Sequence, residues 1–159
     1  MLTDTPPSVG LLLHDAARSM RHAFDARARK LGTTRAQWRT LLYVARNQGA
    51  TQSELADAMD VERISAGRMV DRLVEAGLIE RRADPADRRV WRLHLLPAAH
   101  DLVDRLTELG REIERQALDA LPPAERDQFL DQLSRLGASL RAMRDRSDDG
   151  RTVPESDVA

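Results

Sequence analysis

The sequence predicts a mainly α-helical fold of about six helices that also carries one two-stranded β-hairpin. Hydrophobic residues make up 42% of the chain but aromatic residues only 3%, so leucine, alanine and valine must fill the core. These residue types favour helices over a β-sandwich. Apolar residues recur at intervals of three and four along most of the chain, whereas residues 90–95 alternate at an interval of two.

The first predicted helix covers residues 9–31 and follows a Pro-containing leader, residues 1–8, that we expect to be flexible. Gly32 ends this helix. A helix of this length with a single apolar stripe needs a large partner surface, and in so short a chain that partner could be a second subunit. The stripe consists of Val9, Leu12, Leu13, Ala16, Ala17, Met20, Phe24 and Leu31.

A second helix begins at Thr34, which forms a capping box with Gln37, and ends near residues 47–49. Its inner face contains Trp38, followed by Leu41, Leu42 and Ala45. We interpret both Trp38 and Trp91 as core residues rather than as platforms for a ligand.

Residues 51–77 predict two short helices joined by a tight turn. Thr51 and Glu54 form a capping box at the first helix, Asp60 marks the turn, and Gly77 ends the second helix. Such a pair, with a polar and arginine-bearing outer face on the second helix, suits the major groove of DNA. The outward positions are Glu62, Arg63, Ser65, Arg68, Asp71, Arg72 and Glu75, of which Arg63, Ser65 and Arg68 are our candidate base contacts. The alternative is an ordinary solvated helix face.

A hairpin follows at once, with strands at residues 78–83 and 90–95 and a turn rich in Pro and Asp between them. Five arginines but only two aspartates lie between residues 81 and 92. An arginine-bearing hairpin tip can enter a minor groove or bind phosphate. The candidate contacts are Arg81, Arg88 and Arg89; Arg82 points to the opposite face from Arg81. The alternative is a solvated charged turn.

The helix pair and the hairpin together resemble a known protein family. The run from Leu31 to about Leu106 resembles the MarR family of winged-helix transcriptional regulators. The strongest match is residues 84–89 (DPADRR) followed by VWRLHL, supported by QSELA at 52–56 and DRLVEAGLI at 71–79. The resemblance implies a homodimer that binds a pseudo-palindromic operator and usually represses. It also implies that Arg89 enters the minor groove and that Asp87 holds the wing arginine side chains in place.

Two further helices complete the chain within residues 97–145, the first starting at Pro97 and the second following Leu121-Pro-Pro123. We expect these helices and residues 9–31 to form a dimerisation bundle, with residues 32–96 as the winged helix-turn-helix lobe. A dimer follows physically because a single winged helix makes few phosphate contacts, whereas two can bind successive major grooves. The alternative is an intrachain three-helix core. Residues 146–159 are polar, and we expect them to be disordered.

Composition excludes several other classes of protein. A net charge of −1 means that any binding of double-stranded DNA must come from a local patch. The absence of cysteine rules out disulfides and thiolate nucleophiles, and the histidines show no metal-binding spacing, so we expect neither a metal, a cofactor nor an enzyme. The chain has no long apolar run and no recognisable signal peptide, so we expect a cytoplasmic protein that does not cross a membrane.

One further site is suggested by the first helix, where His14 and Arg18 share a face one turn apart. In the MarR family, which this sequence resembles, small anionic or phenolic effectors often bind between the dimer helices and the DNA-binding lobe. His14, Arg18 and Trp38 could line such a pocket, although an exposed helix face explains the polar pair equally well. We therefore expect a ligand-responsive repressor; the alternatives are a DNA-binding regulator without an effector and a winged-helix module that docks on proteins.

Overall fold

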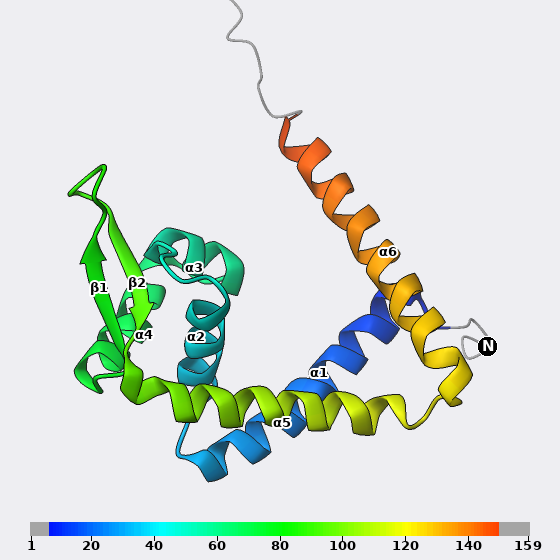
Figure 1. The fold of residues 1–159 in the computed structure, drawn as a ribbon. Helices are drawn as coiled ribbons and strands as arrows, with labels where there is room; N and C mark the ends of the chain where they lie inside the picture. Colours follow the sequence, from blue (N-terminus) through cyan, green and yellow to red (C-terminus); the bar gives the residue numbers. More distant parts are fainter. Residues whose placement is uncertain (1–6, 150–159) are drawn as a thin grey trace, which may run out of the picture. The chain divides into compact units, whose positions relative to one another are not determined.

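The computed structural model describes residues 7–149, which contain six α-helices and one two-stranded antiparallel sheet (Figure 1). This arrangement confirms the predicted fold class. Residues up to Glu114 form one compact unit and residues from Arg115 onward form a second. The elements are α1 (Val9–Ala28), η1 (Arg29–Leu31), α2 (Arg35–Arg46), α3 (Gln52–Met59), α4 (Arg63–Glu75), β1 (Ile79–Ala83), β2 (Trp91–Leu95), η2 (Pro97–Ala99), α5 (His100–Leu118) and α6 (Pro123–Asp149).

The core of the first unit is built mainly from leucine, alanine and valine, as the composition predicts. Helices α2, α3, α4 and α5 and both strands contribute to it. The largest side chains that are completely buried are Leu41, Leu55, Leu73, Ile79, Leu93 and Leu106. Because each of these elements contributes at least one such residue, the helix-turn-helix and the hairpin share a single core.

Local signals in the sequence set most of the helix ends. Thr51 Oγ1 accepts a hydrogen bond from the Glu54 amide at 3.2 Å, and Glu54 Oε2 accepts one from the Thr51 amide at 2.7 Å. The same reciprocal pair links Thr34 and Gln37, so both predicted capping boxes are confirmed. The hydrogen bonds that Thr51 donates hold the pKa of the Glu54 carboxyl below its usual value.

The first helix begins at Val9, as predicted, but its end differs in detail from the prediction. The Ser8 side chain accepts a hydrogen bond from the Leu11 amide at 3.2 Å, so Ser8 caps α1 and does not belong to a flexible leader. The regular helix ends at Ala28 and tightens into a 3-10 turn before Gly32, whose φ of 75° requires a glycine-like conformation. Residues 1–6 of the predicted leader lie outside the described residues.

The hairpin pairs Ile79 with Leu95 at its base and Ala83 with Trp91 near its tip, and its turn projects away from the helices (Figure 1). A short segment that the sequence analysis missed extends this sheet. The Gly49 amide donates to the Leu93 carbonyl at 2.9 Å, and the Leu93 amide donates to the Ala50 carbonyl at 2.8 Å. These bonds fix the base of the hairpin to the start of α3.

The second unit contains the last turn of α5 and the whole of α6. Helix α6 continues to Asp149, so the predicted start of disorder at residue 146 is wrong for residues 146–149. The physical reason is that aspartate, serine and arginine do not stop a helix, and no glycine or proline occurs between Pro123 and Gly150 except Gly137. Residues 150–159 of the predicted tail lie outside the described residues. Within residues 7–149, none of the helices has the length and apolar character needed to cross a bilayer.

Candidate nucleic-acid interface

The start of α4 is held against the start of α3 by a close contact. Gln52 Nε2 donates a hydrogen bond to the Arg63 carbonyl oxygen at 3.3 Å. A Cβ atom added at Gly67 would lie 3.0 Å from the same Gln52 nitrogen. A glycine inside a helix is normally destabilising, but here it allows the two helices to approach closely. Gln52 and Gly67 therefore position the first turns of α4, and the sequence analysis identified neither residue.

The outer face of α4 matches the predicted one. Every residue predicted to point outward is exposed: Glu62, Arg63, Ser65, Arg68, Asp71, Arg72 and Glu75. Ala66, Val70 and Leu73 are fully buried on the opposite side. Within residues 7–149, neither Arg63 nor Arg68 forms an ion pair, so both guanidinium groups are available for another partner.

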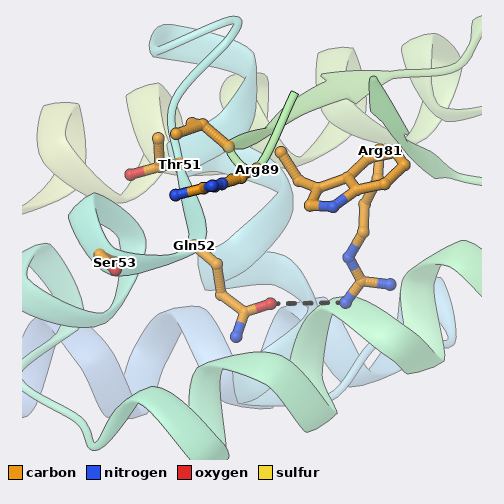
Figure 2. Close-up of a pocket in the computed structure, with 7 residues that line it drawn as sticks. Thr51, Gln52, Ser53, Arg81 and Arg89 are labelled. Atoms are coloured by element: carbon orange, nitrogen blue, oxygen red, sulfur yellow. Dashed lines mark hydrogen bonds between the residues drawn. The ribbon is translucent and has the colours of Figure 1, made fainter. Parts of the chain in front are cut away.

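Arg81 is not a free wing residue. Its Nη2 atom lies 2.6 Å from Asp71 Oδ1 on α4 and 3.5 Å from Gln52 Oε1 on α3, the latter contact being drawn in Figure 2. Its side chain is 28% exposed and joins β1 to both helices of the helix-turn-helix. Arg81 therefore links the hairpin to the helix-turn-helix, and its contact with DNA stays a prediction. Arg82, on the other face of the strand, pairs with Glu80.

Asp84 organises the turn of the hairpin, although the sequence analysis did not single it out. It is buried, and its carboxylate accepts hydrogen bonds from the amides of Ala86 at 2.7 Å and Asp87 at 3.3 Å and from Arg92 Nε. Arg92 in turn donates from Nη1 to the Gly49 carbonyl at 2.8 Å. The Ala86 amide and the Arg92 guanidinium hold the pKa of Asp84 below its usual value.

Asp87 contacts the backbone of its own turn, whereas the family resemblance implies that it holds the wing arginine side chains in place. Its Oδ1 atom accepts a hydrogen bond from the backbone amide of Arg89 at 2.9 Å. In the described part of the chain it pairs with no arginine side chain, because the carboxylate turns back onto its own loop. The carboxylate that binds an arginine side chain in this turn is Asp84. Arg88 and Arg89 are both exposed, and neither forms an ion pair with a described residue.

A cleft of about 580 Å³ separates the hairpin from the start of α3. Figure 2 shows the side chains of Arg89 and Arg81 extending toward Thr51, Gln52 and Ser53 at that start. Trp91 also lines the cleft and is 53% exposed, so its predicted place in the core is wrong. It shares a strand face with the fully buried Leu93, but it pairs with Ala83 near the tip, where the helices no longer cover the sheet.

Comparison with known proteins identifies this arrangement. A family model described as MarR family matches residues 31–90. A putative transcriptional regulatory protein for the hcr operon of Thauera aromatica is 39% identical over 108 residues, which span 66% of this chain and 63% of that relative. The crystal structure of MarR superposes with a TM-score of 0.77 at 29% identity and covers 92% of this chain and 98% of that one. The chain is thus similar to the MarR family in sequence over residues 31–90 and to MarR in fold over most of its length. The family is one of transcriptional regulators and not of enzymes.

A second solved structure is relevant to the interface. It is a mutant of S. aureus MepR bound to an oligodeoxyribonucleotide, and it is 25% identical to this chain with a TM-score of 0.56. The match covers 85% of this chain and 99% of that one. A protein with this fold has therefore been solved in contact with DNA.

A separate cavity of about 570 Å³ lies between α1, α2 and α5. It is lined by Met20, Phe24, Trp38, Leu42, Arg46, Leu106, Thr107, Gly110, Arg111 and Glu114. Trp38 therefore lines a cavity, as the resemblance suggested for an effector pocket. His14 and Arg18 do not line it, because both side chains are exposed on α1 and Arg18 faces Asp15 at 3.8 Å.

Trp38 is held in this wall by contacts with α1. Its Nε1 atom donates to Asp25 Oδ1 at 3.0 Å, and its ring centroid lies 4.3 Å from that of Phe24. Arg35 Nε donates to the other Asp25 oxygen at 2.6 Å, and this bond is the main cause of the lowered pKa of Asp25. Trp38 is thus half-buried and fixed in orientation, in agreement with its predicted structural role.

Proposed function

We propose that this chain is a homodimeric, sequence-specific DNA-binding regulator that represses nearby genes from a pseudo-palindromic operator. One observation carries the proposal. Arg63 and Arg68 on α4 and Arg88 and Arg89 on the hairpin turn are exposed and form no ion pair with any described residue, in a chain whose net charge is only −1. Two separate projections of one lobe thus each present two exposed arginines that have no ion-pair partner among the described residues.

The proposed docking follows from the shapes of these two projections. Helix α4 would enter the major groove with Arg63, Ser65 and Arg68 toward the base edges, since that groove admits an α-helix. The hairpin turn would lie along the adjacent minor groove, with Arg89 inserted and Arg88 near phosphate. The oligonucleotide complex of MepR supports this role for the fold.

Exposed apolar side chains support the homodimer. Val9, Leu11, Leu12 and Met20 are exposed on α1, and Phe129, Leu130, Leu133, Leu140 and Met143 are exposed on α6. A stable monomer rarely leaves such apolar stripes in contact with water. A second copy that covers them would also hold two α4 helices for successive major grooves, about 34 Å apart.

We further propose that a small phenolic or anionic ligand releases the operator by binding in the cavity between α1, α2 and α5. Its volume of about 570 Å³ lies in the ordinary range for small-molecule sites. Met20, Phe24, Trp38 and Leu42 offer apolar and aromatic contacts, and Arg46 and Arg111 offer positive charge. The ligand would act by favouring a spacing of the two lobes that does not match the operator. The ligand can shift the equilibrium between the two spacings only by as much as its affinities for them differ.

The decisive experiment is fluorescence anisotropy with labelled DNA from upstream of the gene, in parallel with a shuffled duplex, over a series of salt concentrations. The proposal expects preferential binding of the upstream DNA, a steep decrease in affinity with salt, and a footprint with two half-sites about one helical turn apart. Equal, weak binding of both duplexes would contradict sequence-specific recognition and would favour a module that docks on proteins.

Two further measurements test the remaining parts of the proposal. Sedimentation at micromolar concentration should give a dimer, and a single monomer species would refute the dimer. Phenols and aromatic carboxylates should release bound DNA from the wild type but not from an Arg46→Ala, Arg111→Ala double variant. If no such compound acts on the wild type, the regulator works without this class of effector.

A further inference from the structure

Ile64 is the second residue of α4 and leaves 69% of its surface exposed. No other large apolar residue in the described part of the chain is as exposed. Single apolar residues are common on protein surfaces, so exposure alone assigns no role. The polar residues around Ile64 and its fixed position on α4 indicate a role.

The side chain stands apart from the other exposed apolar residues. Those lie in stripes on α1 and α6, or in the cleft beside the hairpin in the case of Trp91. Ile64 is flanked instead by the exposed polar residues Arg63, Ser65 and Arg68. A single apolar side chain within a polar face does not make the contiguous patch that a protein partner or a membrane needs. It does suit a surface that mixes hydrogen-bonding groups with isolated methyl groups.

The position of Ile64 is fixed before any partner binds. Gln52 Nε2 holds the Arg63 carbonyl at 3.3 Å, and the Ala66 amide donates to the Glu62 carbonyl at 3.0 Å, so the backbone on both sides of Ile64 is bonded. A β-branched side chain in a helix has one strongly preferred χ1 rotamer. The methyl groups of Ile64 are therefore presented in a defined direction, and little side-chain entropy is lost on contact.

We propose that Ile64 contacts the 5-methyl group of a thymine in the major groove and so contributes to operator specificity. The inference rests on the proposed function, in which the outer face of α4 enters that groove. Thymine is the only standard base whose major-groove edge carries a methyl group, and apolar side chains read it by contact. Arg63, Ser65 and Arg68 offer hydrogen bonds to other base edges, so Ile64 adds a discrimination that they do not provide.

The test compares thymine with deoxyuridine, which differs only by the missing methyl group. Duplexes that bind the full chain are first selected from a random-centre DNA library. The tightest duplex is then synthesised with deoxyuridine at one thymine position at a time, symmetrically in both half-sites. Affinities are measured by anisotropy at one salt concentration for the wild type, Ile64→Ala, Ile64→Val and Ser65→Ala, with circular dichroism to verify that each variant is folded.

At one thymine position, the wild type should bind the deoxyuridine duplex about fourfold more weakly for each half-site, the factor expected for loss of contact with one methyl group. Ile64→Ala should bind the two duplexes equally, whereas Ile64→Val should keep most of the difference. Ser65→Ala should weaken binding to both duplexes by the same factor.

Two outcomes overturn the inference, and they can be told apart from failure of the proposed function. If a duplex is selected but no thymine position is sensitive, or if Ile64→Ala keeps the full sensitivity, Ile64 does not read a methyl group although the chain binds DNA. If no duplex is enriched over random DNA, the proposed function itself fails and the inference fails with it.

Discussion

The recognition helix α4 and the hairpin project from the same lobe, yet different forces hold them. Helix α4 is anchored by Ala66, Val70 and Leu73, which are completely buried. The hairpin turn is anchored by a buried carboxylate, Asp84, through amide hydrogen bonds and the Arg92 guanidinium. The stability gained from apolar burial does not depend on pH but decreases when side-chain volume is removed, whereas a polar network depends on charge and geometry. The two parts should therefore fail under different perturbations.

The largest effect should come from the apolar anchor of α4. Leu73→Ala removes a fully buried side chain and should lower the free energy of unfolding by about 2–5 kcal/mol. Urea denaturation followed by circular dichroism measures this change. Arg72→Ala, at the exposed neighbouring position, should change the same free energy by less than about 0.5 kcal/mol. A change below about 1 kcal/mol in Leu73→Ala would show that the site can collapse around the cavity.

A second prediction separates function from stability at the hairpin. Arg89 is exposed and contributes no ion pair to the fold within the described residues, so Arg89→Ala should unfold like the wild type. It should nevertheless weaken operator binding by about 1–3 kcal/mol, or roughly five- to 150-fold, if it enters the minor groove. Arg105→Ala is the matched control, because Arg105 is an exposed arginine on α5 that forms a 3.8 Å pair with Asp101. Similar losses in both variants would indicate a general charge effect.

The comparison also explains which parts of the site could be predicted from sequence. The outer face of α4 followed from local periodicity. The start of α3 followed from local capping, because Thr51 and Glu54 bond to each other within one helical turn. The contacts that anchor the hairpin could not be predicted from such local patterns. Arg92 reaches the Gly49 carbonyl across 43 positions of sequence, and such a contact exists only after the sheet has formed.

For two other residues, Trp91 and Gly67, local sequence patterns could not predict the environment of the residue in the fold. Alternation placed Trp91 on the same strand face as Leu93, which is correct, but burial depends on how far the helices extend along that face. Trp91 therefore lies in a cleft and not in the core. Local patterns do not single out Gly67, because the close approach of Gln52 that requires a glycine comes from another helix.

A third prediction distinguishes the two aspartates of the turn. Asp84→Asn removes the charge that binds Arg92, so the hairpin should lose order and the operator affinity should decrease roughly tenfold, as expected when a few side chains must be ordered on binding. Asp87→Asn is the control, because an asparagine Oδ1 can still accept the Arg89 amide bond. It should bind within about twofold of the wild type. If Asp87→Asn shows the larger loss, then Asp87 organises the wing as the family resemblance implied.

The smallest effect should be a pH dependence of the hairpin. The pKa of Asp84 is lowered in the folded state from an ordinary value of about 3.9, so the unfolded turn binds more protons than the folded one as the pH falls. The stabilisation by Asp84 is therefore complete above about pH 5 and is lost as the pH falls through the folded pKa. Trp91 reports on this change because it is exposed beside the turn, and Trp38→Phe removes the other tryptophan while keeping an aromatic ring against Phe24.

In that background, Trp91 emission should stay constant from about pH 7 to about pH 5 and then shift as Asp84 is protonated, at a higher pH than any loss of helical circular dichroism. Asp84→Asn has no carboxyl to titrate at this position, so its emission should already resemble the acid form at neutral pH. Asp87 is the other carboxylate in the turn, and Asp87→Asn should leave the transition in place. An unchanged acid transition in Asp84→Asn would assign the titration to another group. That result would also contradict the distinction between a hairpin turn stabilised by the charge of Asp84 and a helix α4 stabilised by apolar burial.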